Sequence, residues 1–89
     1  MQKTRPCVVV TSNKINRRRQ TAVVIPVSTT SPKGLPLYVP LPSVSERSQA
    51  VIDQIRAVDK TRLGDWAATI STAEMVNIFE AMGLVFEVE

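Results

Sequence analysis

Three short apolar runs in the first half of the chain predict β-strands. Residues 7–11 and 21–27 consist mostly of β-branched and other apolar side chains, a composition typical of strands. Residues 37–41 contain Pro40, and the second run contains Pro26. Because proline cannot donate to a strand ladder, it is confined to strand ends and sheet edges. The pattern therefore predicts three strands, the third of them at an edge.

A different pattern in the second half predicts short strands followed by a helix. Residues 50–59 are rich in β-branched side chains, which favours one or two short strands over a helix. Residues 60–64 predict a turn, and residues 66–70 predict one further short strand. Ser71 and Glu74 have the spacing of a capping box, in which each side chain binds the other residue's backbone N–H, so a helix is predicted to begin here. Its apolar stripe, at three- and four-residue steps, consists of Met75, Ile78, Met82 and Phe86.

This succession of elements predicts an α+β fold, with a small, mainly antiparallel sheet or partly closed barrel covered by the C-terminal helix. The chain has 89 residues, which is enough for one domain over residues 1–89 and too few for a second core. A chain of this length buries only roughly 60–65% of the surface that its unfolded form exposes, so an oligomer is expected. Only six residues precede the strand at 7–11, which leaves one edge of it open. We therefore expect strand pairing across a dimer, a swapped segment or poor solubility.

Charge and composition narrow the range of functions. Lys and Arg number 11 against 8 Asp and Glu, and the net charge of +3 favours an anionic partner. The sequence contains no histidine, which excludes imidazole catalysis and His-containing metal sites. Cys7 is the only cysteine, so it cannot form an intramolecular disulfide or a Cys-rich zinc site. We therefore expect no metal and no cofactor, and we expect Cys7 to be a small buried apolar side chain.

Targeting signals are not apparent in the sequence. It has no uninterrupted apolar stretch near the ~20 residues that span a bilayer. Lys3 and Arg5 are not followed by a signal-peptide pattern with a small-residue cleavage site. A cytoplasmic protein that does not bind a membrane is therefore expected.

One candidate site combines a guanidinium with hydroxyl groups. Arg5 precedes the first predicted strand, and Ser28, Thr29 and Thr30 follow the second. If these strands are antiparallel neighbours, both groups meet at the same rim of the sheet. A guanidinium binds phosphate bidentately and hydroxyls donate to its other oxygens, so the set is suited to stabilise a pentavalent phosphorane. The alternative is that Arg5 forms a surface ion pair and Thr29 a turn.

Two charged segments are further candidates. Arg17, Arg18 and Arg19 lie in the predicted loop between the first two strands, either as a solvated surface or as a flap that contacts phosphates. The block Asp53-Gln54-Ile55-Arg56 is either a solvated strand face or the source of a general base. Asp53 would need apolar surroundings to act as a base at neutral pH.

Four segments occur in an order found in a known protein family. They are Arg5-Pro6 with the strand after it, residues 24–29, residues 37–41 and residues 53–64. In that order they resemble the MazF/PemK family of toxin endoribonucleases, from Arg5 to the final helix. The resemblance implies an SH3-like or CcdB-like barrel with a C-terminal helix, a homodimer, and neutralisation by a small cognate antitoxin.

The same resemblance implies an activity. Members of this family are toxins of toxin-antitoxin systems that cut single-stranded mRNA at specific sequences without a metal, by attack of the ribose 2′-hydroxyl on the neighbouring phosphate. The resemblance implies that Arg5 takes part in proton transfer and phosphate stabilisation, and that Asp53 occupies the acidic position that some members use as general base. It also implies that Thr29, with Ser28 beside it, supplies a catalytic hydroxyl. Because a guanidinium with a pKa above ~12 is a poor base, we expect Arg5 to act as an electrostatic clamp or an acid. The residues predicted to bind RNA are Arg17, Arg18, Arg19, Ser28, Thr30, Lys33, Gln54 and Arg56.

The start of the chain departs from the family pattern. Family members normally begin with a Gly-Asp/Glu-Ile-Trp strand and a Glu-Gln-x-Gly loop before the Arg-Pro pair, whereas four residues precede Arg5 here. This departure leaves a second function open, that of a catalytically inactive binding module that engages an antitoxin or nucleic acid. Incubation with mixed-sequence RNA in EDTA distinguishes the two.

Overall fold

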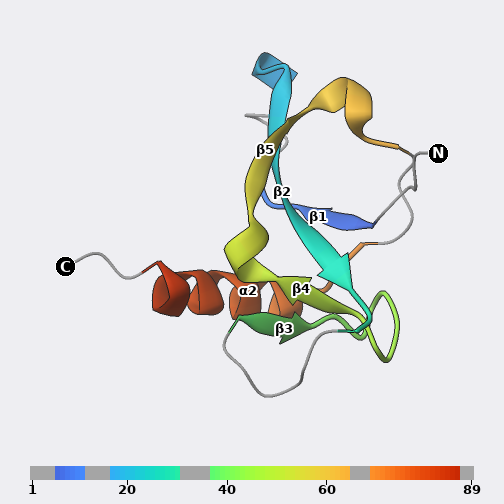
Figure 1. Cartoon of the computed structure of the whole chain (residues 1–89), viewed down its shortest axis with the longest axis vertical. Coiled ribbons are helices and arrows are strands. Elements are labelled where there is room, and N and C mark those ends of the chain that lie inside the picture. Colours follow the sequence, from blue (N-terminus) through green and yellow to red (C-terminus); the bar gives the residue numbers. More distant parts are fainter. Residues whose placement is uncertain (1–5, 12–16, 31–36, 65–68, 87–89) are drawn as a thin grey trace.

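The structure is a computed structural model that describes residues 6–11, 17–30, 37–64 and 69–86, which form a five-stranded antiparallel sheet and a C-terminal helix (Figure 1). The strands are β1 (Cys7–Val9), β2 (Thr21–Ser28), β3 (Tyr38–Pro40), β4 (Gln49–Val51) and β5 (Arg56–Asp59). Short 3₁₀ turns, η1 (Ile52–Gln54) and η2 (Lys60–Arg62), follow β4 and β5, and the helix is α2 (Thr72–Val85). No helix in these ranges is long and apolar enough to cross a bilayer.

Strand β2 is the centre of the sheet. The strand order is β1-β2-β4-β3, and β5 also pairs with β2. All four pairings are antiparallel, and β3 is at an edge as predicted. The predicted α+β class is therefore confirmed. The sheet is not closed into a barrel, because β1 and β3 do not pair with each other within the described ranges.

The strand prediction for residues 50–59 is confirmed, with a turn between the two strands that changes the register. Val27 pairs with Ala50, and Val24 pairs with Arg56. Between these pairs β2 has two residues and the opposite side has five, so three extra residues bulge out as η1. Because of this bulge, β4 and β5 pair with different parts of the same edge of β2, and the sheet bends between them.

Pro26 lies opposite this bulge. The N–H of Val27 donates to the carbonyl of Pro6 at 3.1 Å, so the odd-numbered residues of β2 form their hydrogen bonds with the β1 side. The even-numbered residues, Pro26 among them, face the other flank, where Lys60 donates its N–H to the carbonyl of Gln20 at 2.7 Å. A proline is tolerated inside the central strand because η1 interrupts the ladder at that position.

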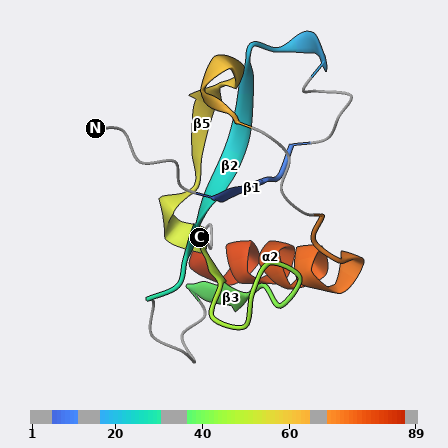
Figure 2. The ribbon, with the colours of Figure 1, turned by 90° about the vertical axis from the view of Figure 1, so that its right-hand side faces the viewer.

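The core lies between the sheet and α2. Figures 1 and 2 show α2 alongside β3 and β4, and the helix contacts β3 and η1. The core side chains are Val8, Ile25, Val39, Leu41, Ala50, Ile52, Ile78 and Ala81. Among them, Ile25, Leu41, Ile52 and Ile78 are fully buried. Each such side chain contributes about 1.5–3 kcal/mol by its removal from water.

The prediction that Cys7 is buried is wrong. Neighbouring side chains of a strand point to opposite faces, and in β1 it is Val8 that enters the core, with 7% of its surface exposed. Cys7 is therefore on the outer face and is exposed. Its surroundings still remove some water from the thiol, which raises the pKa of Cys7, and the positive charge of Arg56 partly opposes this rise. The thiol form is thus favoured at neutral pH.

The predicted capping box begins α2. Ser71 Oγ accepts from the N–H of Glu74 at 3.1 Å, and Glu74 Oε1 accepts from the N–H of Ser71 at 2.6 Å. The predicted apolar stripe is confirmed at Ile78, with Met75 and Met82 packed beside it. It is wrong at Phe86, which is 45% exposed. The helix ends at Val85, so Phe86 leaves the helical path, and Ala81 and Val85 complete the buried side instead.

Two other predictions concern connecting segments. The turn at residues 60–64 is confirmed by η2, which the Asp59 carboxylate caps by accepting from the N–H of Thr61 at 2.9 Å. The strand predicted at 66–70 falls largely outside the described residues, and its described members, Thr69 and Ile70, are not in a strand. Thr69 and Ile70 differ from the prediction because they lead directly into Ser71, which caps the first turn of α2.

Candidate functional site

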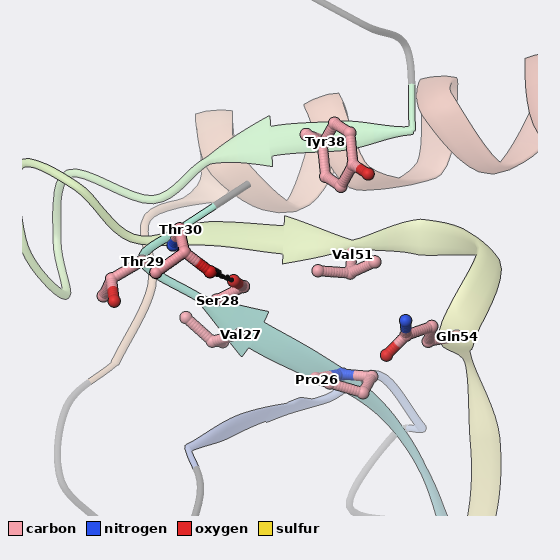
Figure 3. A pocket seen from close by; sticks show the side chains of 8 residues that line it. All are labelled: Pro26, Val27, Ser28, Thr29, Thr30, Tyr38, Val51 and Gln54. Carbon is pink, nitrogen blue, oxygen red and sulfur yellow. Dashed lines mark hydrogen bonds between the residues drawn. The ribbon is translucent and has the colours of Figure 1, made fainter. Parts of the chain in front are cut away.

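A pocket of about 370 Å³ lies at the end of β2, where β2, β3 and η1 come together (Figure 3). Its volume is within the range of small-molecule sites. The lining residues are Pro26, Val27, Ser28, Thr29, Thr30, Tyr38, Val51 and Gln54.

Strand register explains which side chains reach the pocket. Tyr38 pairs with Val51, and the next pair along the same two strands is Val39 with Ala50. Val39 and Ala50 belong to the core, so the alternation of side chains directs Tyr38 and Val51 to the opposite face of the sheet. Figure 3 shows Tyr38 and Val51 on that face, with α2 behind the strands. The pocket and the core therefore occupy opposite sides of β3 and β4.

Three hydroxyl residues form one rim of the pocket. Ser28 is the last residue of β2 and is half-buried, whereas Thr29 and Thr30 follow the strand and are exposed. The N–H of Thr30 donates to Ser28 Oγ at 3.2 Å, and the two side-chain oxygens are 3.3 Å apart. This turn orients Ser28 and Thr30 toward each other, while the hydroxyl of Thr29 points away from them (Figure 3).

The η1 bulge contributes the side-chain amide of Gln54 to the pocket. Gln54 lines the pocket, and its neighbour Asp53 does not, although both belong to the same 3₁₀ turn. Asp53 is exposed, so the apolar surroundings that would favour a general base are not found there. Arg56, which begins β5, is exposed and also lies outside the lining.

Among the described residues, none of the predicted phosphate-binding cations lines the pocket. Arg5 and Lys33 lie outside the described residues. Arg17, Arg18 and Arg19 are exposed near the start of β2, at the opposite end of that strand from the pocket. Of the residues predicted to bind RNA, the structure therefore brings together Ser28, Thr30 and Gln54.

Sequence reasoning missed the apolar part of the pocket. Tyr38, Val51 and Pro26 were expected only as strand residues. Tyr38 is the one of these residues that the sequence could have indicated. It is the only tyrosine and lies two residues before Pro40 in an edge strand, where a half-exposed aromatic ring is expected. Its titratable phenol is the only ionisable side chain among the described residues of the lining. In the described part of the chain, no three His, Cys, Asp or Glu side chains are grouped so that they could hold a metal ion.

Solved structures of several toxins are similar to this fold. The Mycobacterium tuberculosis toxin MazF-mt6 superposes with a TM-score of 0.84 at 23% identity, over 96% of this chain and 88% of that chain. An endoribonuclease from a mycobacterial species gives a TM-score of 0.83 at 25% identity, over 94% of this chain and 81% of that chain. A chain of a MazE-MazF structure from Deinococcus radiodurans gives a TM-score of 0.81 at 21% identity, over 96% of this chain and 87% of that chain.

Sequence comparison identifies the family. No curated protein matches the sequence at a significant level. Residues 1–86 match the family described as PemK-like, MazF-like toxins of type II toxin-antitoxin systems. Since this match covers nearly the whole 89-residue chain and the fold is that of MazF structures, the chain belongs to the PemK-like, MazF-like toxin family.

Proposed function

We propose that this toxin is a sequence-specific endoribonuclease that cuts single-stranded mRNA without a metal. Membership of the toxin family supports the proposal, as does the fold it shares with an endoribonuclease from a mycobacterial species at 25% identity. The pocket at the end of β2 adds hydroxyl and amide groups on a concave surface, which is the chemistry that a ribose-phosphate ligand requires.

The reaction is an internal transfer within the RNA. The ribose 2′-oxygen forms a bond to phosphorus, and the bond from phosphorus to the 5′-oxygen of the next nucleotide breaks. A base removes the 2′ proton, and the departing 5′-oxygen receives a proton, so the products are a 2′,3′-cyclic phosphate and a 5′-hydroxyl. We assign phosphate stabilisation and protonation of the leaving oxygen to Arg5. Removal of the 2′ proton is assigned to Asp53 on the family resemblance alone, because Asp53 is exposed and does not line the pocket.

One contact carries the proposal. The N–H of Val27 donates to the carbonyl of Pro6 at 3.1 Å, so β2 is held beside β1 up to the residue before Ser28. Pro6 is bonded to Arg5 in the sequence. The hydroxyl rim and the residue next to Arg5 therefore belong to the same antiparallel pair, which is the arrangement that a shared phosphate site needs.

The geometry favours Ser28 over Thr29 as the hydroxyl that contacts phosphate. Ser28 is half-buried at the strand end, and Thr30 holds its Oγ through two contacts of 3.2 and 3.3 Å. When the Thr30 hydroxyl donates to Ser28 Oγ, the proton of Ser28 is free to donate to a phosphate oxygen. Thr29 is exposed, and its hydroxyl points outward (Figure 3). We keep Thr29 as a second candidate that lines the same pocket.

The proposed protein partners are a cognate antitoxin and a second copy of the chain. The fold is shared with a chain of a MazE-MazF structure and with an endoribonuclease in complex with its cognate antitoxin. β1 has no partner on its outer side among the described strands, which favours pairing with another chain. Sedimentation at micromolar concentration tests dimer formation, and a monomer there contradicts it.

The decisive experiment is RNA cleavage by the purified chain in EDTA, with analysis of the ends. The proposal expects cleavage at a limited set of sequences, with cyclic phosphate and 5′-hydroxyl ends. Arg5→Ala and Asp53→Asn should each lower the rate by about 10²–10³. The matched controls are Arg47→Ala and Glu46→Gln, which alter exposed residues of the turn after β3. Strict dependence on magnesium, or 5′-phosphate ends, contradicts the mechanism.

One observation favours a second candidate function, that of a binding module without catalysis. Asp53 does not line the pocket, and Tyr38 is the only ionisable group among the described lining residues. A site without a base at the reacting oxygen binds nucleic acid or an antitoxin but does not cut RNA. RNA that is bound and recovered intact after long incubation supports this second function over the first.

A further inference from the structure

Among the described residues, positive charge is concentrated at the end of β2 away from the pocket. The described ranges contain seven Lys and Arg side chains, and five of them lie just before β2 or in η2. We call these five residues the basic end: Arg17, Arg18, Arg19, Lys60 and Arg62. Figures 1 and 2 show the ribbon at residues 17–18 and the η2 turn at the same end of the β2-β5 pair.

Backbone pairing joins the two parts of the basic end. The N–H of Lys60 donates to the carbonyl of Gln20 at 2.7 Å, and Thr21 pairs with Asp59. The arginine segment, just before β2, and η2, just after β5, therefore lie next to each other at one end of this antiparallel pair. All three arginines and Arg62 are exposed, and Lys60 is half-buried.

Within the described residues, little negative charge lies beside these cations. The one carboxylate of the described residues at this end is Asp59, which is exposed. Its Oδ1 accepts from the N–H and from the hydroxyl of Thr61, both at 2.9 Å, so it is engaged in capping η2. Within the described part of the chain, no ion pair joins Arg17, Arg18 or Arg19 to a carboxylate. No described carboxylate therefore competes with an anionic ligand for these three guanidinium groups.

The basic end is too far from the pocket to contact the same phosphate. β2 runs from Thr21, beside the basic end, to Ser28, at the pocket rim. Seven steps along an extended strand cover about 23 Å. A ligand that contacts both regions must therefore extend along the sheet over several phosphates.

The chemistry of the basic end fits a nucleic-acid backbone better than a protein segment. Protein interfaces usually depend on a few buried aromatic or aliphatic anchors. The exposed large apolar residues of the described chain lie elsewhere, at Val44 and on or just after α2 at Val76, Phe79, Leu84 and Phe86. Binding of a phosphate backbone needs no such apolar anchor, and arginine is well suited to it.

We propose that the basic end is a second RNA-binding surface, which holds the phosphates of nucleotides several positions away from the one in the pocket. This inference rests on the proposed function, because it takes single-stranded RNA as the ligand. It assigns Lys60 and Arg62 to RNA binding together with the three arginines. It also makes affinity depend on RNA length, since a short RNA in the pocket does not reach the basic end.

The test compares RNAs of about 4 and about 16 nucleotides, the range of site sizes found for single-strand-binding grooves. The probes are 2′-O-methyl RNAs, which lack the attacking hydroxyl and stay intact during the measurement. Binding is measured by fluorescence anisotropy over a series of salt concentrations. The wild-type chain should bind the long RNA at least about tenfold more tightly than the short one, with a steeper salt dependence.

Two variants remove the charge in separate groups, R17Q/R18Q/R19Q and K60Q/R62Q. Each should reduce the preference for the long RNA and make the plot of log affinity against log salt shallower, by ~0.7 for each phosphate that the variant no longer neutralises. Arg47→Gln is the matched control, because Arg47 is exposed in the turn after β3 and lies outside both regions. Unchanged thermal unfolding midpoints show that the variants are folded.

Each outcome decides a different question. Equal binding of long and short RNA by the wild-type chain, or an unchanged length preference in both variants, overturns the second surface while leaving RNA cleavage intact. An acidic peptide such as poly-glutamate that binds the basic end as tightly as the long RNA overturns the assignment to nucleic acid. If the wild-type chain neither binds nor cuts any RNA, the proposed function itself fails.

Discussion

Glu74, in the first turn of α2, accepts two hydrogen bonds from Ser43, which lies 31 residues earlier in the chain. The N–H of Ser43 donates to Glu74 Oε2 at 3.0 Å, and its hydroxyl donates to Oε1. The same carboxylate accepts from the cap residue Ser71. A side chain that forms a local capping box thus also fastens the turn after β3 to the helix that covers the core.

This arrangement predicts a stability that depends on Glu74 and on pH. Burial raises the pKa of Glu74, but the hydrogen bonds from Ser43 and Ser71 outweigh it and lower the pKa to about 2. Because this value lies below the ordinary 4.5, the stabilisation is fully present above pH 4.5 and is lost as the pH falls through about 2. Urea unfolding between pH 7 and pH 2 should show this loss in the wild-type chain.

The substitution Glu74→Gln should remove this pH-dependent part of the unfolding free energy. We expect a loss of about 1–3 kcal/mol at neutral pH, since the neutral amide replaces charge-assisted hydrogen bonds, and a smaller dependence on acid. Glu80→Gln is the control, because Glu80 is exposed on the same helix. An acid dependence that is identical in Glu74→Gln and the wild-type chain contradicts the argument.

The alternation of side chains along β1 predicts that one substitution destabilises the protein strongly and that its neighbour has little effect on stability. Val8→Ala removes two carbon atoms from the core and should cost about 2 kcal/mol of unfolding free energy. Cys7→Ala alters an exposed position and should stay within about 0.5 kcal/mol. Denaturant unfolding of the two variants measures both. A larger loss for Cys7→Ala than for Val8→Ala would show that β1 presents the other face to the core.

The two hydroxyl candidates can be separated by kinetics. If Ser28 donates to the phosphate in the transition state, Ser28→Ala should lower kcat by about 10²–10³ with a small change in KM. Thr29→Ala should have a smaller effect on kcat, because its hydroxyl points away from Ser28 and Thr30 (Figure 3). Thr72→Ala, an exposed change at the start of α2, is the control. The reverse order of effects would assign the role to Thr29.

Tyr38 is predicted to be a stacking surface for a base of the bound RNA. It lines the pocket beside Val51, and an aromatic face contributes about 1–3 kcal/mol per stacked base. Tyr38→Ala should therefore weaken binding of an uncleavable RNA by about 10- to 100-fold, while Tyr38→Phe should retain most of the affinity. Equal weakening in both variants would assign the effect to the hydroxyl rather than to the ring.

Local patterns in the sequence were sufficient to predict those helices and strands whose formation depends on residues adjacent in the chain. The helix start at Ser71 followed from a capping box, which involves only four consecutive residues. The strand at β2 followed from a run of β-branched residues, and the edge position of β3 followed from Pro40. The resemblance to the MazF/PemK family rested on the order of such segments and was confirmed by the family match.

Tertiary structure decided which face each short strand buries and which residues meet. A strand of three residues such as β1 has too few positions for its alternation to identify the inner face, so Cys7 was misplaced. The pocket depends on the register of β3 with β4 and on the three-residue η1 bulge beside Pro26, which are properties of pairing between distant segments. The separation of Arg17, Arg18 and Arg19 from the pocket has the same origin, because only the pairing of β2 with β5 places these arginines beside η2 and leaves the hydroxyl rim at the other end of the strand.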